Sequence, residues 1–554
     1  METDQLEVIQ TWRAAQRQLD WVIQHYFQSV IALNSIPSDA IEVYSATRTE
    51  SSGIWHEIHD QAQAMPSKIQ TLETGMRKLH SVHNRSPTLV PISKLPREIL
   101  VYIFYLICNH EGEWGVNCKG FHDSLPDLNK ISLVCSQWRA LALDEPSFWS
   151  HLTFNPDRNS EPRNYSWNLL QRSIERSPGQ PLCITVITDR FPRNSTQTQV
   201  AFDYLLPFSD NIKYLRVLDY NRYRIFIPWF LGKVGTPSLQ VLTLSSTDRV
   251  NQGIFDSVDE SYPALSDPEY EACLLSVRSL HLNQASIEWN NPVYRNLVSL
   301  TLSNVSVGRR THPTVDDILG ILSASPQLHT LRLHTTIFPS GNHETLPSQV
   351  HLEALEYLDL RNTKTEGLLQ MLPRLHVSSK QLYFEVEMHN DSSYIVAMKE
   401  FLARTNVVKL LLKNKISSSW TDYRGPIDER IVPALEGFLC MVPNLKSLMI
   451  DCDSTPNSLS SILKAMVHSA SANEQNPWLP ELRAFYVARG ALGKDAIEAF
   501  ARAYPLLQTM RLMWCELPSC ADFDQWLTQT IEFPKVVNRD GEPGDLPSCF
   551  FHLA

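Results

Sequence analysis

The side chains best suited to chemistry in this chain are its cysteines and histidines, and their spacing matches no known site. None of the ten cysteines stands in C-x-x-C spacing, which argues against a zinc ribbon or a thioredoxin-type motif. Two histidine pairs, His56 with His59 and His80 with His83, lack neighbouring cysteines or paired carboxylates. Phosphate-loop, dinucleotide-loop, nucleophile-elbow and zinc-protease strings are absent from the sequence. We therefore predict no metal, no cofactor and no enzymatic activity.

Composition narrows the class of protein further. The 554 residues are 43% hydrophobic and 20% charged, as in globular proteins. A net charge of −11 argues against non-specific binding to nucleic acid. The N-terminus is acidic and polar, unlike a signal peptide, and the apolar run at 99–107 falls short of the roughly 20 residues of a membrane span. The sequence predicts an intracellular protein, cytoplasmic and/or nuclear, without membrane or nucleic-acid partners.

The elements that organise the chain begin with two helices in residues 1–84. Apolar residues recur there at alternating spacings of three and four, which is a heptad pattern. The first stripe is Ile9, Trp12, Gln16, Leu19, Ile23, Tyr26, Val30 and Leu33, and the second is Trp55, Ile58, Ala62, Met65, Ile69, Leu72, Met76 and Leu79. Pro37 is expected to stop the first helix, and Pro66 to end or kink the second near Ala64 to Met65. Either the helices form a structural pair, alone or against the next domain, or they self-associate.

A second organised segment covers residues 91–154. Leu95 and Pro96 open a helix that carries the apolar run ILVYIFYLI, a polar insertion at about 108–127 reads as a loop, and a second helix starts near 127–129. Three groups of residues in this segment, taken in order, form a known pattern. They are Leu95, Pro96, Glu98, Ile99, Leu100, Ile103 and Phe104, then Val134, Cys135, Trp138, Arg139, Leu141 and Ala142, then Pro146 and Trp149. This ordered string resembles the F-box, although the insertion is longer than the usual F-box spacer.

The resemblance implies an all-α module that docks on a Skp-family adaptor, which connects it to a cullin–RING ubiquitin ligase. A module this small is not expected to bury the whole apolar run, so part of it should face a partner. The resemblance makes these residues candidates for adaptor contact or its immediate support: Leu95, Pro96, Ile99, Leu100, Ile103, Val134 and Trp138. We favour direct contact for Leu95, Pro96 and Leu100, and a core position for Phe104 and Trp138.

Residues 180–515 contain a recurring L-x-x-L-x-L string. Clear copies are LQVLTL at 239–244, LVSLTL at 297–302, LHTLRL at 328–333 and LEYLDL at 355–360, with a degenerate copy at 381–386. Successive anchors are about 29 residues apart, and several strings follow an amphipathic helix and a P-x-L turn. The region resembles a leucine-rich repeat of irregular length, which implies a solenoid with a curved parallel sheet and outer helices.

The predicted architecture is therefore α/β. It consists of a helical, coiled-coil-like segment at 1–84, an F-box-like domain at 91–154, a leucine-rich-repeat solenoid at 180–515 and a C-terminal cap or tail at 516–554. As a whole it resembles the F-box proteins with C-terminal leucine-rich repeats, of the fungal F-box-like kind.

Side chains between and after the repeat leucines are expected on the concave face of the sheet. Arg332, His334 and Arg361 would form a modest basic patch there, suited to a phosphate or an acidic peptide or simply solvated. An apolar strip of Leu411, Met449, Tyr486 and Met513 would follow towards the C-terminal end. The strip either binds a protein ligand or is covered by the tail or by ordinary packing.

Two functions remain open at this point. The first is the substrate-recognition subunit of a Skp-adaptor/cullin/F-box ubiquitin ligase, in which the solenoid holds an unknown target protein and partner subunits do the chemistry. The second is a scaffold protein outside any ligase, whose F-box-like module no longer binds the adaptor. The long insertion at 108–127 is the observation that supports this second function.

Overall fold

The computed structural model describes most of the chain in separate stretches. These are 2–37, 51–84, 91–108, 124–154, 165–187, 202–218, 230–231, 238–245, 268–285, 287–305, 313–339, 349–389, 391–413, 435, 437–451, 462–468, 479–489, 492–513 and 515. The chain divides into two compact units, residues 1–96 with 135–137, and residues 97–134 with 138–554. The predicted tail at 516–554 lies outside the described residues.

The first unit contains two long helices, α1 (Glu2–Asn34) and α3 (Ser51–Asn84), and a 3-10 turn, η1 (Pro91–Lys94). Both predicted helices are confirmed, and α1 ends before Pro37. Of the end or kink expected near Ala64 to Met65, the end is wrong, since α3 runs through Pro66 as one helix. Pro66 removes only one helical hydrogen bond, and Ala62, whose carbonyl loses its partner, is exposed to water.

The second unit opens with three helices, α4 (Arg97–Cys108), α5 (Ser124–Val134) and α6 (Ser136–Asp144). The 3-10 turn η2 (Pro146–Trp149) and strand β1 (His151–Phe154) follow. The single second helix expected near 127–129 is thus two helices, separated at Cys135, and the first begins three residues earlier. Pro126 is compatible with that start because the first turn of a helix needs no partner for its N–H groups. Residues 109–123 of the predicted insertion lie outside the described residues.

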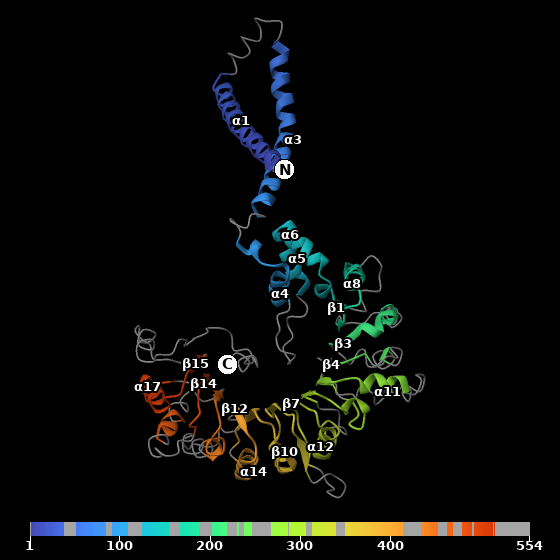
Figure 1. The fold of residues 1–554 in the computed structure, drawn as a ribbon, viewed down its shortest axis with the longest axis vertical. Coiled ribbons are helices and arrows are strands. Elements are labelled where there is room, and N and C mark those ends of the chain that lie inside the picture. Colours follow the sequence, from blue (N-terminus) through green and yellow to red (C-terminus); the bar gives the residue numbers. More distant parts are fainter. Residues whose placement is uncertain are drawn as a thin grey trace. The chain divides into compact units, whose positions relative to one another are not determined.

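Thirteen parallel strands form one continuous sheet in which each strand lies beside the next along the chain (Figure 1). β1 pairs with β2, so the end of the predicted all-α segment already belongs to this sheet. The five repeat strings identified from the sequence overlap strands of this sheet: β4 (Val241–Ser245), β6 (Ser299–Ser303), β7 (Thr330–His334), β9 (Tyr357–Asp359) and β11 (Leu382–Glu387). The other strands of the sheet are β2 (Leu182–Val186), β3 (Ile212–Val217), β5 (Ser279–Asn283), β12 (Val407–Lys413), β13 (Ser447–Asp451), β14 (Ala484–Ala488) and β15 (Thr509–Met513). A mixed α/β fold with a large parallel sheet is confirmed.

Helices and short turns connect the strands and lie along the outer side of the arc that the sheet follows (Figure 1). They are α8 (Tyr165–Arg176), η3 (Leu206–Asn211), α11 (Pro268–Leu275), η5 (Pro292–Tyr294), α12 (Val315–Ser323), α13 (Thr365–Met371), η6 (Leu372–Arg374), α14 (Ser392–Ala403) and α17 (Lys494–Ala503). Two short strands, β8 (Val350–Leu352) and β10 (Leu375–Val377), form a separate parallel pair. Thr314 and Asp317 cap α12 reciprocally, which fixes where that helix starts.

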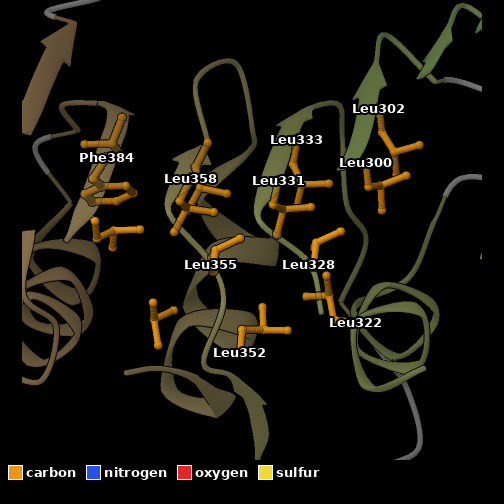
Figure 2. Packing of buried hydrophobic residues seen from close by; sticks show 14 of the residues in the cluster. Leu300, Leu302, Leu322, Leu328, Leu331, Leu333, Leu352, Leu355, Leu358 and Phe384 are labelled. Atoms are coloured by element: carbon orange, nitrogen blue, oxygen red, sulfur yellow. The ribbon is translucent and has the colours of Figure 1, made fainter. Parts of the chain in front are cut away.

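The hydrophobic core lies between the sheet and these helices. The strands contribute alternate side chains to it, such as Leu300 and Leu302 from β6 and Leu331 and Leu333 from β7, all fully buried. Figure 2 shows these leucines stacked from strand to strand, with Leu322 of α12 and neighbouring turn leucines below them. The alternation of side chains along a strand sends the intervening residues to the opposite, concave face.

Three strands are followed directly by a residue with a left-handed backbone: Gln284 after β5, Asn304 after β6 and Arg489 after β14, with φ between 49° and 58°. Asn304 turns the chain after β6, and its N–H donates to the carbonyl of His334 in β7. We expect Asn304→Gly to leave stability nearly unchanged and Asn304→Val to lower it by about 1–2 kcal/mol, because a β-branched residue tolerates this conformation poorly. Urea unfolding of both variants tests this, and equal stability of the two would contradict it.

Candidate functional site

Helix α4 presents two apolar faces with different surroundings. Leu100, Phe104 and Cys108 are spaced by four residues and buried. Ile99, Tyr102 and Leu106 follow each other at spacings of three and four, so they share the other side of the helix. These three are 46%, 60% and 47% exposed. A helix that is apolar on both sides buries one face in its own domain and leaves the second for another molecule.

The buried face of α4 rests on a small aromatic core. The Phe104 ring lies 4.7 Å from the Trp138 ring and 6.4 Å from the Phe148 ring, measured between centroids. The indole N–H of Trp149 donates to the carbonyl of Ala142 at 3.0 Å. These contacts tie α6 and η2 to α4, so the orientation of the exposed face is set by the module's own packing.

The concave face of the sheet carries a row of side chains in register. Backbone pairing places side by side Thr185, Arg216, Thr243, His281, Thr301, Arg332, Asp359, Glu385, Leu411, Met449, Tyr486 and Arg511. His334 and Met513 stand two residues further along their strands, on the same face. Of the residues predicted on this face, the register places Arg332, Leu411, Met449 and Tyr486 side by side in this row.

The basic patch predicted in the middle of this face is neutralised by acidic neighbours. Arg361 contacts Asp359 at 2.7 Å and Glu385 at 2.7 Å, and His334 Nε2 lies 2.6 Å from Asp359. Arg332 stacks over the Tyr357 ring at 4.6 Å. Sequence alone did not pair these groups, because Glu385 and Arg361 meet only through strand register. We name Tyr357, His334, Asp359, Arg361 and Glu385 the charge cluster.

Burial and neighbouring charges set the pKa values within the charge cluster. For Asp359, burial raises the pKa, but Arg361 and His334 outweigh it and hold the pKa below its usual range. For Glu385, burial and then the charge of Asp359 raise the pKa to about 7, against the opposing effect of Arg361. Asp359 is therefore the carboxylate that stays charged, and Glu385 changes its protonation near neutral pH.

The raised pKa of Glu385 predicts a pH dependence of stability. Folding strengthens proton binding at this carboxyl, so its contribution is complete below the ordinary pKa of 4.5 and is lost as the pH rises through about 7. Between about pH 5 and about pH 8, the free energy of unfolding of the wild type should fall by about 1–3 kcal/mol more than that of the Glu385→Gln variant. Urea unfolding at both pH values measures this, and identical pH profiles of the two proteins would refute it.

The apolar strip predicted on the concave face is buried in the structure. Leu411, Met449, Tyr486 and Met513 are each less than 5% exposed and form a small cluster with Ala484 and Ala488. Of the two alternatives left open for this strip, this burial favours cover or ordinary packing over an open ligand surface. A role of these residues in target binding stays a prediction.

Comparison with known protein families identifies the segment that contains α4, α5 and α6. Residues 92–155 match the sequence model of the F-box-like family. An F-box-like domain thus covers this segment, as the sequence reading expected. No curated protein sequence matches the chain.

Within the F-box-like domain, the predicted contact residues differ in their exposure. Ile99 and Val134 are exposed, Ile103 and Trp138 are partly covered, and Leu100 is 1% exposed. Leu100 points into the core with Phe104, so the structure places it in support of the fold rather than at the surface. In the first unit, Leu95 is half-buried and its N–H closes the η1 turn on Ile92, while Pro96 is exposed.

Other exposed apolar residues of the F-box-like domain were not singled out from the sequence. Tyr102, Leu106 and Ile107 extend the exposed side of α4, and Leu133, 73% exposed, stands beside Val134 at the end of α5. The run 99–107 is apolar in every direction, so periodicity alone did not separate the outer face from the inner one. The arrangement of polar residues along α5 did not predict that Leu133 is exposed.

Two further findings concern other classes of site. Among the residues that the structure describes, no three histidine, cysteine or carboxylate side chains gather closely enough to hold a metal ion. No helix within the described stretches is both long enough and apolar enough to cross a membrane.

Proposed function

We propose that this chain is the substrate-recognition subunit of a Skp-adaptor/cullin/F-box ubiquitin ligase. The observation that carries the proposal is the outer face of α4, where Ile99, Tyr102 and Leu106 are exposed above an intact aromatic core. F-box-like domains generally bind Skp-type adaptors, and an apolar helix face that fits a groove is the surface such binding needs. The chain itself is proposed to bind and position, while partner subunits perform the transfer of ubiquitin.

The repeating strand units support the second half of the proposal. Their parallel order and the stacked leucines of the core are what a leucine-rich-repeat solenoid of the fungal F-box-like kind would show. We propose that the concave face holds a protein target. Arg332, which stacks over the Tyr357 ring, and Thr243 are partly exposed in this row, and we propose that they present donors to the target.

Co-purification of the full-length chain with a Skp-family adaptor and a cullin tests the proposal. A stoichiometric three-component complex is expected on size-exclusion chromatography. A folded chain that elutes without the adaptor would instead support the alternative, a scaffold protein whose F-box-like domain has lost its partner. The long insertion between α4 and α5, largely outside the described residues, is the feature that favours this alternative.

A further inference from the structure

The two N-terminal helices leave their heptad stripes open to solvent. In α1, the stripe side chains Ile9, Trp12, Leu19, Ile23, Tyr26, Val30 and Leu33 are all exposed. In α3, Ile69, Leu72, Met76 and Leu79 are exposed in the same way. Apolar surface of this extent along two helices exceeds what a monomeric protein normally presents to water.

The residue types at the heptad positions indicate which kind of molecule covers these stripes. The a positions of α1 hold β-branched residues, Ile9, Ile23 and Val30, and the d positions include Leu19 and Leu33. In α3 the same division places Trp55, Ala62, Ile69 and Met76 at a and Ile58, Met65, Leu72 and Leu79 at d, so the pattern of α1 recurs there only around Ile69 and Leu72. Branched residues at a with leucine at d favour two parallel strands. From this pattern we propose that α1 and α3 form parallel coiled coils with a second copy of this chain.

Gln16 distinguishes a second copy from a hairpin within one chain. It is the single polar member of the α1 stripe, at an a position. The stripe of α3 contains only apolar residues, so α1 packed on α3 would offer the Gln16 amide no partner beyond its weak hydrogen bond to Asp20 of the same helix. In a parallel pair of α1 helices, Gln16 meets Gln16 of the other copy and the two amides bond each other. A polar a residue also fixes the register of such a pair.

The charges beside the α3 stripe and the apolar area along both helices support a parallel dimer. Lys68 precedes the a residue Ile69 and Glu73 follows the d residue Leu72, the flanking positions whose opposite charges meet across a parallel pair. α1 and α3 have 33 and 34 residues, so strips about 10 Å wide along two helices of about 50 Å offer about 1,000 Å² per chain. This exceeds the roughly 800 Å² per partner of an ordinary stable interface.

Light scattering of the purified full-length chain tests the proposal. The wild type is expected at twice the chain mass of 63.3 kDa. Ile23→Glu should weaken the dimer by about a hundredfold or more, because it buries two facing charges in the stripe. The matched control Gln24→Glu adds the same charge on an exposed neighbour outside the stripe and should leave the dimer intact. A monomeric wild type, or equal effects of the two substitutions, would overturn the proposal.

A second variant tests the parallel register without depending on dimer strength. Gln16→Cys places two thiols at the same level of a parallel, in-register pair, so mild oxidation should link two copies covalently where the wild type stays unlinked. A dimer that fails to link through this cysteine would overturn the parallel arrangement.

Discussion

Replacing Ile99 by aspartate is expected to weaken adaptor binding by about a hundredfold or more while leaving the chain folded. Ile99 is 46% exposed on the outer face of α4, so the free protein tolerates a charge there. In the proposed complex the same carboxylate would be pressed into an apolar groove without a partner for its charge. Calorimetric titration of the purified adaptor measures the change, and circular dichroism verifies the fold.

Two comparison variants make this result specific to the outer face. Val396→Asp introduces the same charge at an apolar residue of α14 that is 56% exposed, and it should bind the adaptor as the wild type does. Leu100→Ala removes a buried side chain and should lower stability by about 2–5 kcal/mol, while the folded fraction still binds. If Ile99→Asp binds normally, the outer face of α4 is not the docking surface.

Removing the carboxylate of Asp359 is expected to lower the free energy of unfolding by about 3–5 kcal/mol, the largest stability effect among these predictions. Asp359 is fully buried and accepts hydrogen bonds from the side chain and the backbone N–H of Arg361, with His334 beside it. Asp359→Ala leaves a buried guanidinium with Glu385 as its remaining charge partner, and a histidine with no carboxylate. Urea unfolding at neutral pH measures the loss.

Two variants separate the lost ion pair from a general effect of substitution. Glu356→Ala, at an exposed position just before β9, should change the free energy of unfolding by less than about 0.5 kcal/mol. Asp359→Ala combined with Arg361→Met should cost less than the sum of the two single changes, because the second removes the cation that the first leaves uncompensated. A loss below about 1 kcal/mol for Asp359→Ala would show that the charge cluster contributes little.

Sequence reasoning predicted the strands well because their signal is local and repeated. Each L-x-x-L-x-L string lies on a strand whose two inward leucines are buried, as Leu242 and Leu244 of β4 illustrate. The αL residue that ends β6, Asn304, is less visible in sequence because asparagine is equally frequent in ordinary loops. Strand β1 was missed since HLTF carries only one leucine and no repeat string.

The candidate sites were predicted only in part, for reasons that lie in tertiary contacts. Leu100 and Ile99 are adjacent apolar residues, and only the packing of Phe104 of α4 against Trp138 of α6 decides which faces out. Likewise, Arg332 and Arg361 look equally basic in sequence. Arg361 is neutralised by Glu385, which is 24 residues distant and reaches it through the pairing of β9 with β11.

Hydrogen exchange of the full-length chain with and without a Skp-family adaptor tests the central claim most directly. The account predicts adaptor-dependent protection of the backbone in α4, at the end of α5 around Leu133 and in α6, with exchange in the strands of the sheet unchanged. Protection confined to the concave strands, or none in α4, would contradict the proposed docking surface.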